Sequence, residues 1–100
     1  MVKHIVLFKT IEFESVEKRM ECLTEIKVAL EGLPQEIDVL RSMEVGINAN
    51  PAEAWDFSLI AVVGSMEEVE QYSLHPAHLR VAKLIGKIKK DRACVDYFFR

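Results

Sequence analysis

The sequence has 100 residues, half of which are hydrophobic, and a formal net charge of −3. This length suits one domain, so we expect residues 1–100 to form a single domain. The negative charge lacks the basic footprint of a nucleic-acid-binding domain, and we expect no nucleic-acid partner. No apolar run is long enough to span a bilayer, and the first residues lack the apolar core of a signal peptide, so we expect a cytoplasmic protein without membrane contact.

Residues 2–9 predict a first strand, because they are rich in strand-forming residues and too few for a free-standing helix. In a strand, His4 and Phe8 would share one face, and Ile5 and Leu7 would share the other. Both faces carry large apolar groups, so we expect both to be covered.

Residues 15–31 predict the first helix, with Ser15 as its N-cap. Its expected buried positions follow helical spacing: Val16, Met20, Leu23, Ile26 or Lys27, and Leu30. We expect Gly32 to end this helix in the left-handed conformation, and Pro34 cannot continue the turn.

Residues 39–46 predict a second strand, whose polar content favours the edge of a sheet. A short loop of turn-forming residues leads from there to a third strand at residues 55–63, as in a hairpin. The third strand is continuously apolar from Leu59 onward. That pattern is typical of a central strand that is covered on both faces.

Ser65 and Glu68 have the spacing of a capping box, which predicts a second helix that carries Val69 and Tyr72 inward. Pro76 interrupts this helix and suits the first position of a new helical segment. The expected apolar stripe of that segment is Leu79, Ala82, Ile85 and Ile88. Residues 91–99 predict the last strand.

The predicted order is strand, helix, strand, strand, helix, strand, which indicates an α+β, ferredoxin-like βαββαβ fold with a four-stranded antiparallel sheet. Both crossover helices then cover the same face of the sheet. The other face keeps apolar side chains that are too numerous for a soluble monomer. We therefore expect a homodimer formed through the open sheet face, where one patch serves both subunits.

Several segments, in order and spacing, resemble the stress-responsive A/B barrel domain (Dabb) family. They are residues 3–8, Val45 with Gly46, Ser65 with residues 67–72, residues 75–79 and residues 91–97. The resemblance implies a dimeric α+β barrel, in which two ferredoxin-like subunits join their sheets. The wider superfamily includes cofactor-free monooxygenases, haem-degrading enzymes and polyketide cyclases, so the resemblance alone does not select a reaction.

One plant branch of that family closes linear polyketides with a tyrosine and a histidine. The matching residues here are Tyr72 and His78, and His4 matches the strand-one histidine of the same pocket. A further pocket histidine is replaced by an apolar residue, about Phe57, and an aromatic residue of the first helix by about Ile26. The resemblance therefore implies His78 and Tyr72 as candidate catalytic residues, and His4 as a weaker candidate.

His78 occupies the third position of the helix opened by Pro76, where the helix dipole disfavours the imidazolium form. A neutral His78 could accept a proton, while Tyr72 could donate a hydrogen bond to a carbonyl oxygen that gains negative charge. The alternative is structural: His75 and His78 bond to backbone groups at the helix break. For His4 the alternative is a core or dimer-interface histidine.

We expect neither a cofactor nor a metal. His75 and His78 could face one metal ion with Glu68 or Glu70, but no third ligand is fixed by the spacing. The cysteines, Cys22 and Cys94, have no zinc-binding spacing and are interpreted as free buried thiols.

Two functions remain open. The first is a homodimeric Dabb protein of stress-response or small-molecule-binding type without catalysis, whose ligand would be small and apolar or aromatic. The alternative is a cofactor-free enzyme, similar to a polyketide cyclase or a monooxygenase, that uses Tyr72 and His78 in a cavity within each subunit.

Overall fold

The computed structural model describes residues 1–100. Its strands are β1 (Val2–Thr10), β2 (Ser42–Ile47), β3 (Phe57–Val63) and β4 (Lys89–Phe98). Its helices are α1 (Val16–Glu31), α2 (Met66–Leu74) and α3 (Pro76–Gly86), and a 3₁₀ turn spans Leu33–Gln35. None of these helices is both long and apolar enough to cross a membrane.

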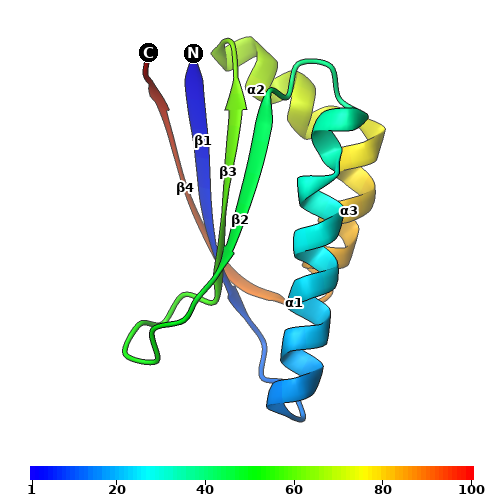
Figure 1. The fold of residues 1–100 in the computed structure, drawn as a ribbon, viewed down its shortest axis with the longest axis vertical. Coiled ribbons are helices and arrows are strands. Elements are labelled where there is room, and N and C mark those ends of the chain that lie inside the picture. The colour runs from blue at the N-terminus through cyan, green and yellow to red at the C-terminus, as the bar shows by residue number, and fades with distance from the viewer.

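The four strands form one antiparallel sheet in the order β2-β3-β1-β4. All helices lie on one face of this sheet, as Figure 1 shows. The predicted ferredoxin-like βαββαβ fold is confirmed, with the second crossover divided into α2 and α3. As predicted, β2 lies at an edge and β3 in the interior of the sheet.

The helices begin where the sequence places their caps, but two details differ. Ser15 and Ser65 accept hydrogen bonds from the backbone N–H groups of Lys18 and Glu68. The Glu68 carboxylate, however, accepts from the N–H of Gly64 at 2.7 Å and not from that of Ser65. Gly32 has a φ of −82°, so the predicted left-handed ending of α1 was wrong. The chain continues instead into the right-handed 3₁₀ turn that contains Pro34.

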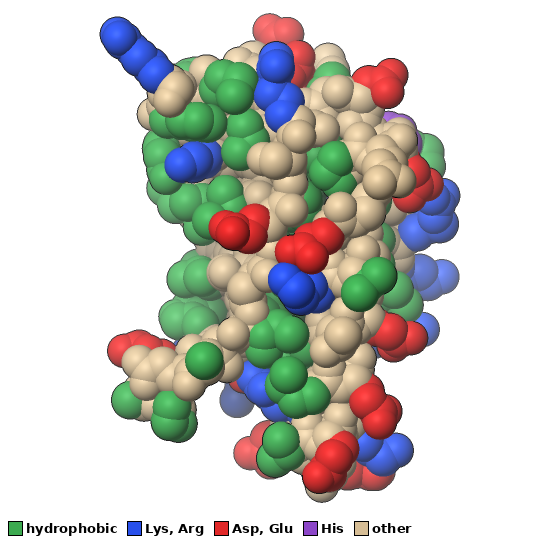
Figure 2. All heavy atoms as spheres, viewed as in Figure 1, with side chains coloured by type: hydrophobic (Ala, Val, Ile, Leu, Met, Phe, Trp, Pro, Cys, Tyr) green, Lys and Arg blue, Asp and Glu red, His purple; other side chains and the backbone are tan.

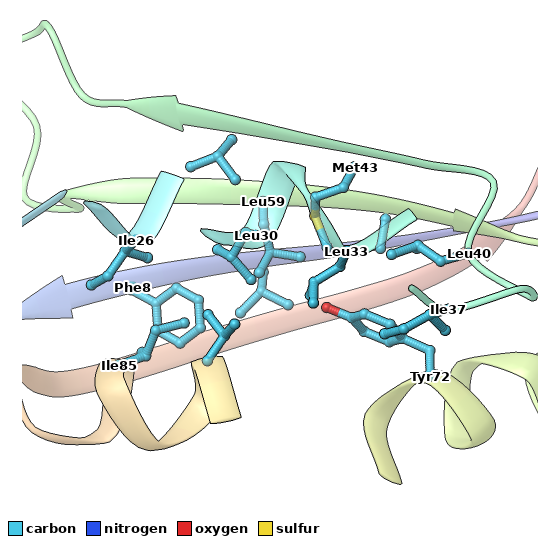
Figure 3. Packing of buried hydrophobic residues seen from close by; sticks show 14 of the residues in the cluster. Phe8, Ile26, Leu30, Leu33, Ile37, Leu40, Met43, Leu59, Tyr72 and Ile85 are labelled. Atoms are coloured by element: carbon cyan, nitrogen blue, oxygen red, sulfur yellow. The ribbon is translucent and has the colours of Figure 1, made fainter. Parts of the chain in front are cut away.

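The second strand is shorter at its start than predicted. Residues 39–41 precede β2, and the apolar side chains of Ile37 and Leu40 turn into the core from the connection after α1. Figure 3 shows both residues beside Leu33, Met43 and the ring of Tyr72. The apolar run that resembled the start of a strand therefore closes one end of the core.

The helix stripes also differ from prediction in part. On α1, Leu23, Ile26 and Leu30 are buried, but Val16 is 74% exposed and Met20 is 40% exposed. On α3 the buried residues are Ala77, Val81 and Ile85, while Leu79 is 52% exposed. Pro76 starts a new helix, and residue spacing alone did not fix which side of that helix faces the core.

The sheet face away from the helices stays apolar and open. We call it the open face, and its central members are Ile5, Leu7, Ile60, Val62, Val95 and Tyr97. Val95 is 53% exposed and Tyr97 is 42% exposed. In Figure 2, hydrophobic side chains gather along the left of the molecule, which is the sheet side in this view. The uncovered patch that the sequence predicts is therefore present on a single chain.

Candidate functional site

A cavity of about 120 Å³ lies between the sheet and the helices α2 and α3. Five of its lining residues have titratable side chains: His4, Tyr72, His78, Lys89 and Arg92. The other lining residues are Val6, Phe8, Leu59, Ser73, Ala82 and Ile85. The three residues that sequence and resemblance single out, Tyr72, His78 and His4, therefore meet at one cavity, and their catalytic role stays a prediction.

Tyr72 projects inward from α2 and is only 1% exposed. Its hydroxyl is buried and has no hydrogen-bond partner in the protein. Figure 3 shows this hydroxyl pointing away from α2 into the layer between sheet and helices, with Leu33 beside it. Burial raises the pKa of Tyr72 well above its usual range, against a smaller lowering by the charge of Arg92. The hydroxyl is thus a neutral donor, and leaving it unpaired costs free energy.

His78 faces Tyr72 from the first turn of α3, with the two ring centroids 4.5 Å apart. Its Nδ1 lies 2.9 Å from the carbonyl oxygen of Ser73. A carbonyl oxygen only accepts, so Nδ1 carries the proton and Nε2 of the neutral ring keeps a free lone pair. The structural alternative for His78 is therefore present, and it also prepares the ring to accept a proton at Nε2.

Burial is the largest cause that lowers the pKa of His78. The hydrogen bond to Ser73 opposes this lowering, while the nearby charges of His4 and Arg92 add to it. The direction agrees with the neutral His78 that the sequence predicts. The dominant cause is desolvation, however, and not the helix dipole from which the sequence predicts a neutral ring.

His4 lies on the helix side of β1 and is 7% exposed. Its Nδ1 lies 2.5 Å from Oδ1 of Asp96 and 3.5 Å from the thiol sulfur of Cys94. The His4 ring also meets the ring of Tyr72 edge-on, with centroids 5.9 Å apart. A carboxylate that accepts from Nδ1 fixes the ring orientation, so Asp96 is a positioning residue for this wall of the cavity.

Sequence reasoning did not find Cys94 and Asp96 beside His4. The three ligand atoms lie within 4.8 Å of one another, as in sites that hold a metal ion. In this structure Nδ1 of His4 already forms a hydrogen bond with the Asp96 carboxylate, so these two groups satisfy each other without a metal ion. The signal that could have found the pair is the antiparallel register of β1 and β4, in which His4 is directly opposite Asp96.

His75 has a structural position outside the cavity. It is the N-cap of α3, and its Nδ1 accepts a hydrogen bond from the N–H of Ala77 at 3.0 Å. The structure does not bring His75 and His78 together with Glu68 or Glu70 as a group of metal ligands. The structural interpretation of His75 is the one that the hydrogen bonds support.

The two cysteines are free, but neither is buried as predicted. Cys22 is half-buried on α1, and Cys94 is exposed on β4. Partial burial raises the pKa of the Cys94 thiol, and the charge of Asp96 adds to this effect. Edge strand β4 is covered by no helix, which explains the exposure of Cys94.

The two positions that depart from the plant pattern are both core residues. The ring of Phe57 stacks on that of Phe8, with centroids 4.8 Å apart. Ile26 is 2% exposed on α1. Apolar side chains at both positions leave the polar groups of the cavity on β1, β4, α2 and α3.

Solved structures show the same fold. The chain is 42% identical to a dimeric protein of unknown function with a ferredoxin-like fold from Bacteroides fragilis, with a TM-score of 0.92 over 98% of this chain and 95% of that one. A dimeric ferredoxin-like protein of unknown function from Thermobifida fusca is 24% identical, with a TM-score of 0.79 over 98% and 90%. A hydroxynitrile lyase from Passiflora edulis is 15% identical, with a TM-score of 0.80 over 99% and 93%, and shows the fold alone.

No curated protein matches the sequence. A family model described as the stress responsive A/B barrel domain, Dabb, matches residues 2–99. Because this match spans nearly the whole chain, the chain belongs to the stress responsive A/B barrel domain (Dabb) family.

Proposed function

We propose that this Dabb protein is a homodimer that binds a small molecule in each subunit, in the cavity beside Tyr72 and His78. The observation that carries the proposal is the cavity that Tyr72, His78 and His4 line together, in which Tyr72 also has a buried hydroxyl without a partner in the protein. Native proteins leave very few buried polar groups unpaired. A ligand atom that accepts a hydrogen bond from this hydroxyl would remove the cost.

The size and lining of the cavity limit the ligand. A volume of about 120 Å³ is near the size of an apolar cavity that holds one benzene ring, about 150 Å³. Phe8, Leu59 and Ile85 supply apolar walls, and His78 supplies an acceptor at Nε2. This lining suits a ligand of about one ring, or an aliphatic chain of similar volume, that carries one or two polar atoms.

The dimer belongs to the same proposal. Ile5 lies at the centre of the open face, directly opposite Ile60 on β3 and Val95 on β4. Burying such a patch against a second copy removes apolar surface from water on both subunits. The dimeric relatives from Bacteroides fragilis and Thermobifida fusca support this assembly.

A cofactor-free enzyme is the second candidate function, and the free Nε2 of His78 favours it. A neutral imidazole 4.5 Å from a phenol ring, centroid to centroid, could remove a proton while Tyr72 stabilises the charge that develops on an oxygen. The hydroxynitrile lyase shows that this fold hosts an enzyme. His78→Asn would abolish turnover of any substrate found, with binding largely retained, if His78 is the base.

Protein-observed NMR with a set of single-ring compounds tests binding. We expect signals of Tyr72 and His78 to shift in the wild type, and the shifts to disappear in Ala82→Leu, whose larger side chain fills part of the cavity. Val28→Leu on the exposed side of α1 is the matched control, and it should behave like the wild type. A compound set that leaves the wild-type cavity signals unchanged would contradict the proposal.

A further inference from the structure

The charges along the cavity are all of one sign. Lys89 and Arg92 line it from β4, and none of its lining residues is an aspartate or a glutamate. Neither cation takes part in an ion pair within the chain. Two cations without a paired carboxylate give this side of the cavity a positive charge.

The neighbouring carboxylate, Asp96, forms no ion pair with either cation. Asp96, on the same face of β4, is engaged by Nδ1 of His4. The charge of Arg92 reaches both inner polar groups, since it lowers the pKa of Tyr72 and that of His78. Arg92 also lines the same cavity as Tyr72 and His78, so it can act on the same ligand. Lys89 and Arg92 are exposed, so the solvent side of the cavity is at β4.

We infer that the cavity takes a small organic monocarboxylate, whose apolar body packs against Phe8, Leu59 and Ile85 and whose charge is held by Arg92 and Lys89. This inference rests on the proposed function and adds the chemical class of the ligand. An arginine provides paired donors that match a carboxylate, and a charge-assisted hydrogen bond is about twice as strong as a neutral one. A neutral Tyr72 hydroxyl at the same cavity adds a donor without adding negative charge.

Three probes of nearly equal shape separate charge from size: benzoate, benzamide and benzamidinium, which carry negative, zero and positive charge. Titration followed by NMR or calorimetry gives a Kd for each. We expect benzoate to bind about tenfold or more tightly than benzamide, and benzamidinium not to bind. Added salt should weaken benzoate binding and leave benzamide binding nearly unchanged.

Variants of single cations show which residues account for the preference for benzoate. Arg92→Gln should weaken benzoate binding about tenfold without changing benzamide binding, and Lys89→Gln should have a smaller effect of the same kind. Lys90→Gln is the control, because Lys90 is adjacent on β4 and changes the net charge equally but does not line the cavity. Unchanged benzoate binding in Lys90→Gln would show that the local cations act, and not the total charge.

The outcomes separate the two claims. If benzamide or benzamidinium binds as tightly as benzoate, or if Lys90→Gln weakens benzoate as much as Arg92→Gln does, the carboxylate inference is overturned while the binding cavity stands. If none of the three probes, nor the wider set of single-ring compounds, reaches the wild-type cavity, the proposed function fails together with the inference.

Discussion

The Nδ1 atom of His4 lies 2.5 Å from Oδ1 of Asp96, across the paired strands β1 and β4. This bond joins a buried ring to the edge strand that no helix covers. Removing the carboxylate in Asp96→Ala leaves a buried donor unpaired, which we expect to lower the free energy of unfolding by about 1.5–3 kcal/mol. Urea denaturation at fixed protein concentration measures the change.

Asp38→Ala is the control for that variant, because Asp38 is exposed and makes no ion pair or hydrogen bond through its side chain. We expect it to stay within about 0.5 kcal/mol of the wild type. Equal stabilities for Asp96→Ala and Asp38→Ala would show that the contact with His4 contributes nothing.

Tyr72→Phe removes a buried hydroxyl that has no partner in the protein. We therefore expect the ligand-free variant to be as stable as the wild type, or more stable by about 1 kcal/mol, because the cost of burying an unpaired group disappears. Thermal unfolding of ligand-free protein at one fixed concentration checks this. A clear loss of stability in Tyr72→Phe would mean that the hydroxyl already has a partner.

The lowered pKa of His78 predicts a pH dependence of stability. Just below its ordinary pKa of about 6.5, the unfolded chain binds a proton at His78 that the folded protein does not. The free energy of unfolding is thus unaffected by His78 above about pH 6.5, and it decreases as the pH falls below that value. The loss is about 1.4 kcal/mol for each unit of difference between the two pKa values.

Unfolding free energies of the wild type and His78→Asn between pH 7.5 and 5 isolate this contribution. The wild type should lose more stability than the variant over that range, while carboxyl groups titrate at lower pH in both proteins. Parallel curves for the two proteins would show that His78 has an ordinary pKa.

Ile5→Lys places a charge at the centre of the open face, opposite Ile60 and Val95. Burying an unpaired ammonium group is costly, so we expect the dimer to dissociate into monomers at micromolar concentration. Size-exclusion chromatography with light scattering gives the mass. Val28→Lys, at a position 67% exposed on α1, should remain dimeric, and a dimeric Ile5→Lys would place the interface elsewhere.

Local sequence patterns predicted the parts of the fold that depend on neighbouring residues. The alternation in β1 placed His4 and Phe8 on the helix side, and Pro76 marked the break between α2 and α3. Ser15 and Ser65 marked the helix starts. These features follow from periodicity, capping and the missing N–H of proline, which act over a few residues.

Features that depend on contacts between distant segments were not predictable in the same way. Val81 and not Leu79 is buried on α3, because the rotation of that helix is set by packing against α1 and the shared core. The contact of His4 with Asp96 and Cys94 required the register of β1 and β4. The pairing of Tyr72 with His78 came from family resemblance, and the cations Lys89 and Arg92 became part of the cavity only in the folded chain.

Native mass spectrometry of the wild type and Ala82→Leu, each with the single-ring compounds in excess, tests the binding cavity most directly. The account predicts a wild-type dimer that carries up to one added molecule per subunit, and an Ala82→Leu dimer that carries none. A wild-type dimer that remains empty, or an added mass that persists equally in Ala82→Leu, would contradict a ligand site beside Tyr72 and His78.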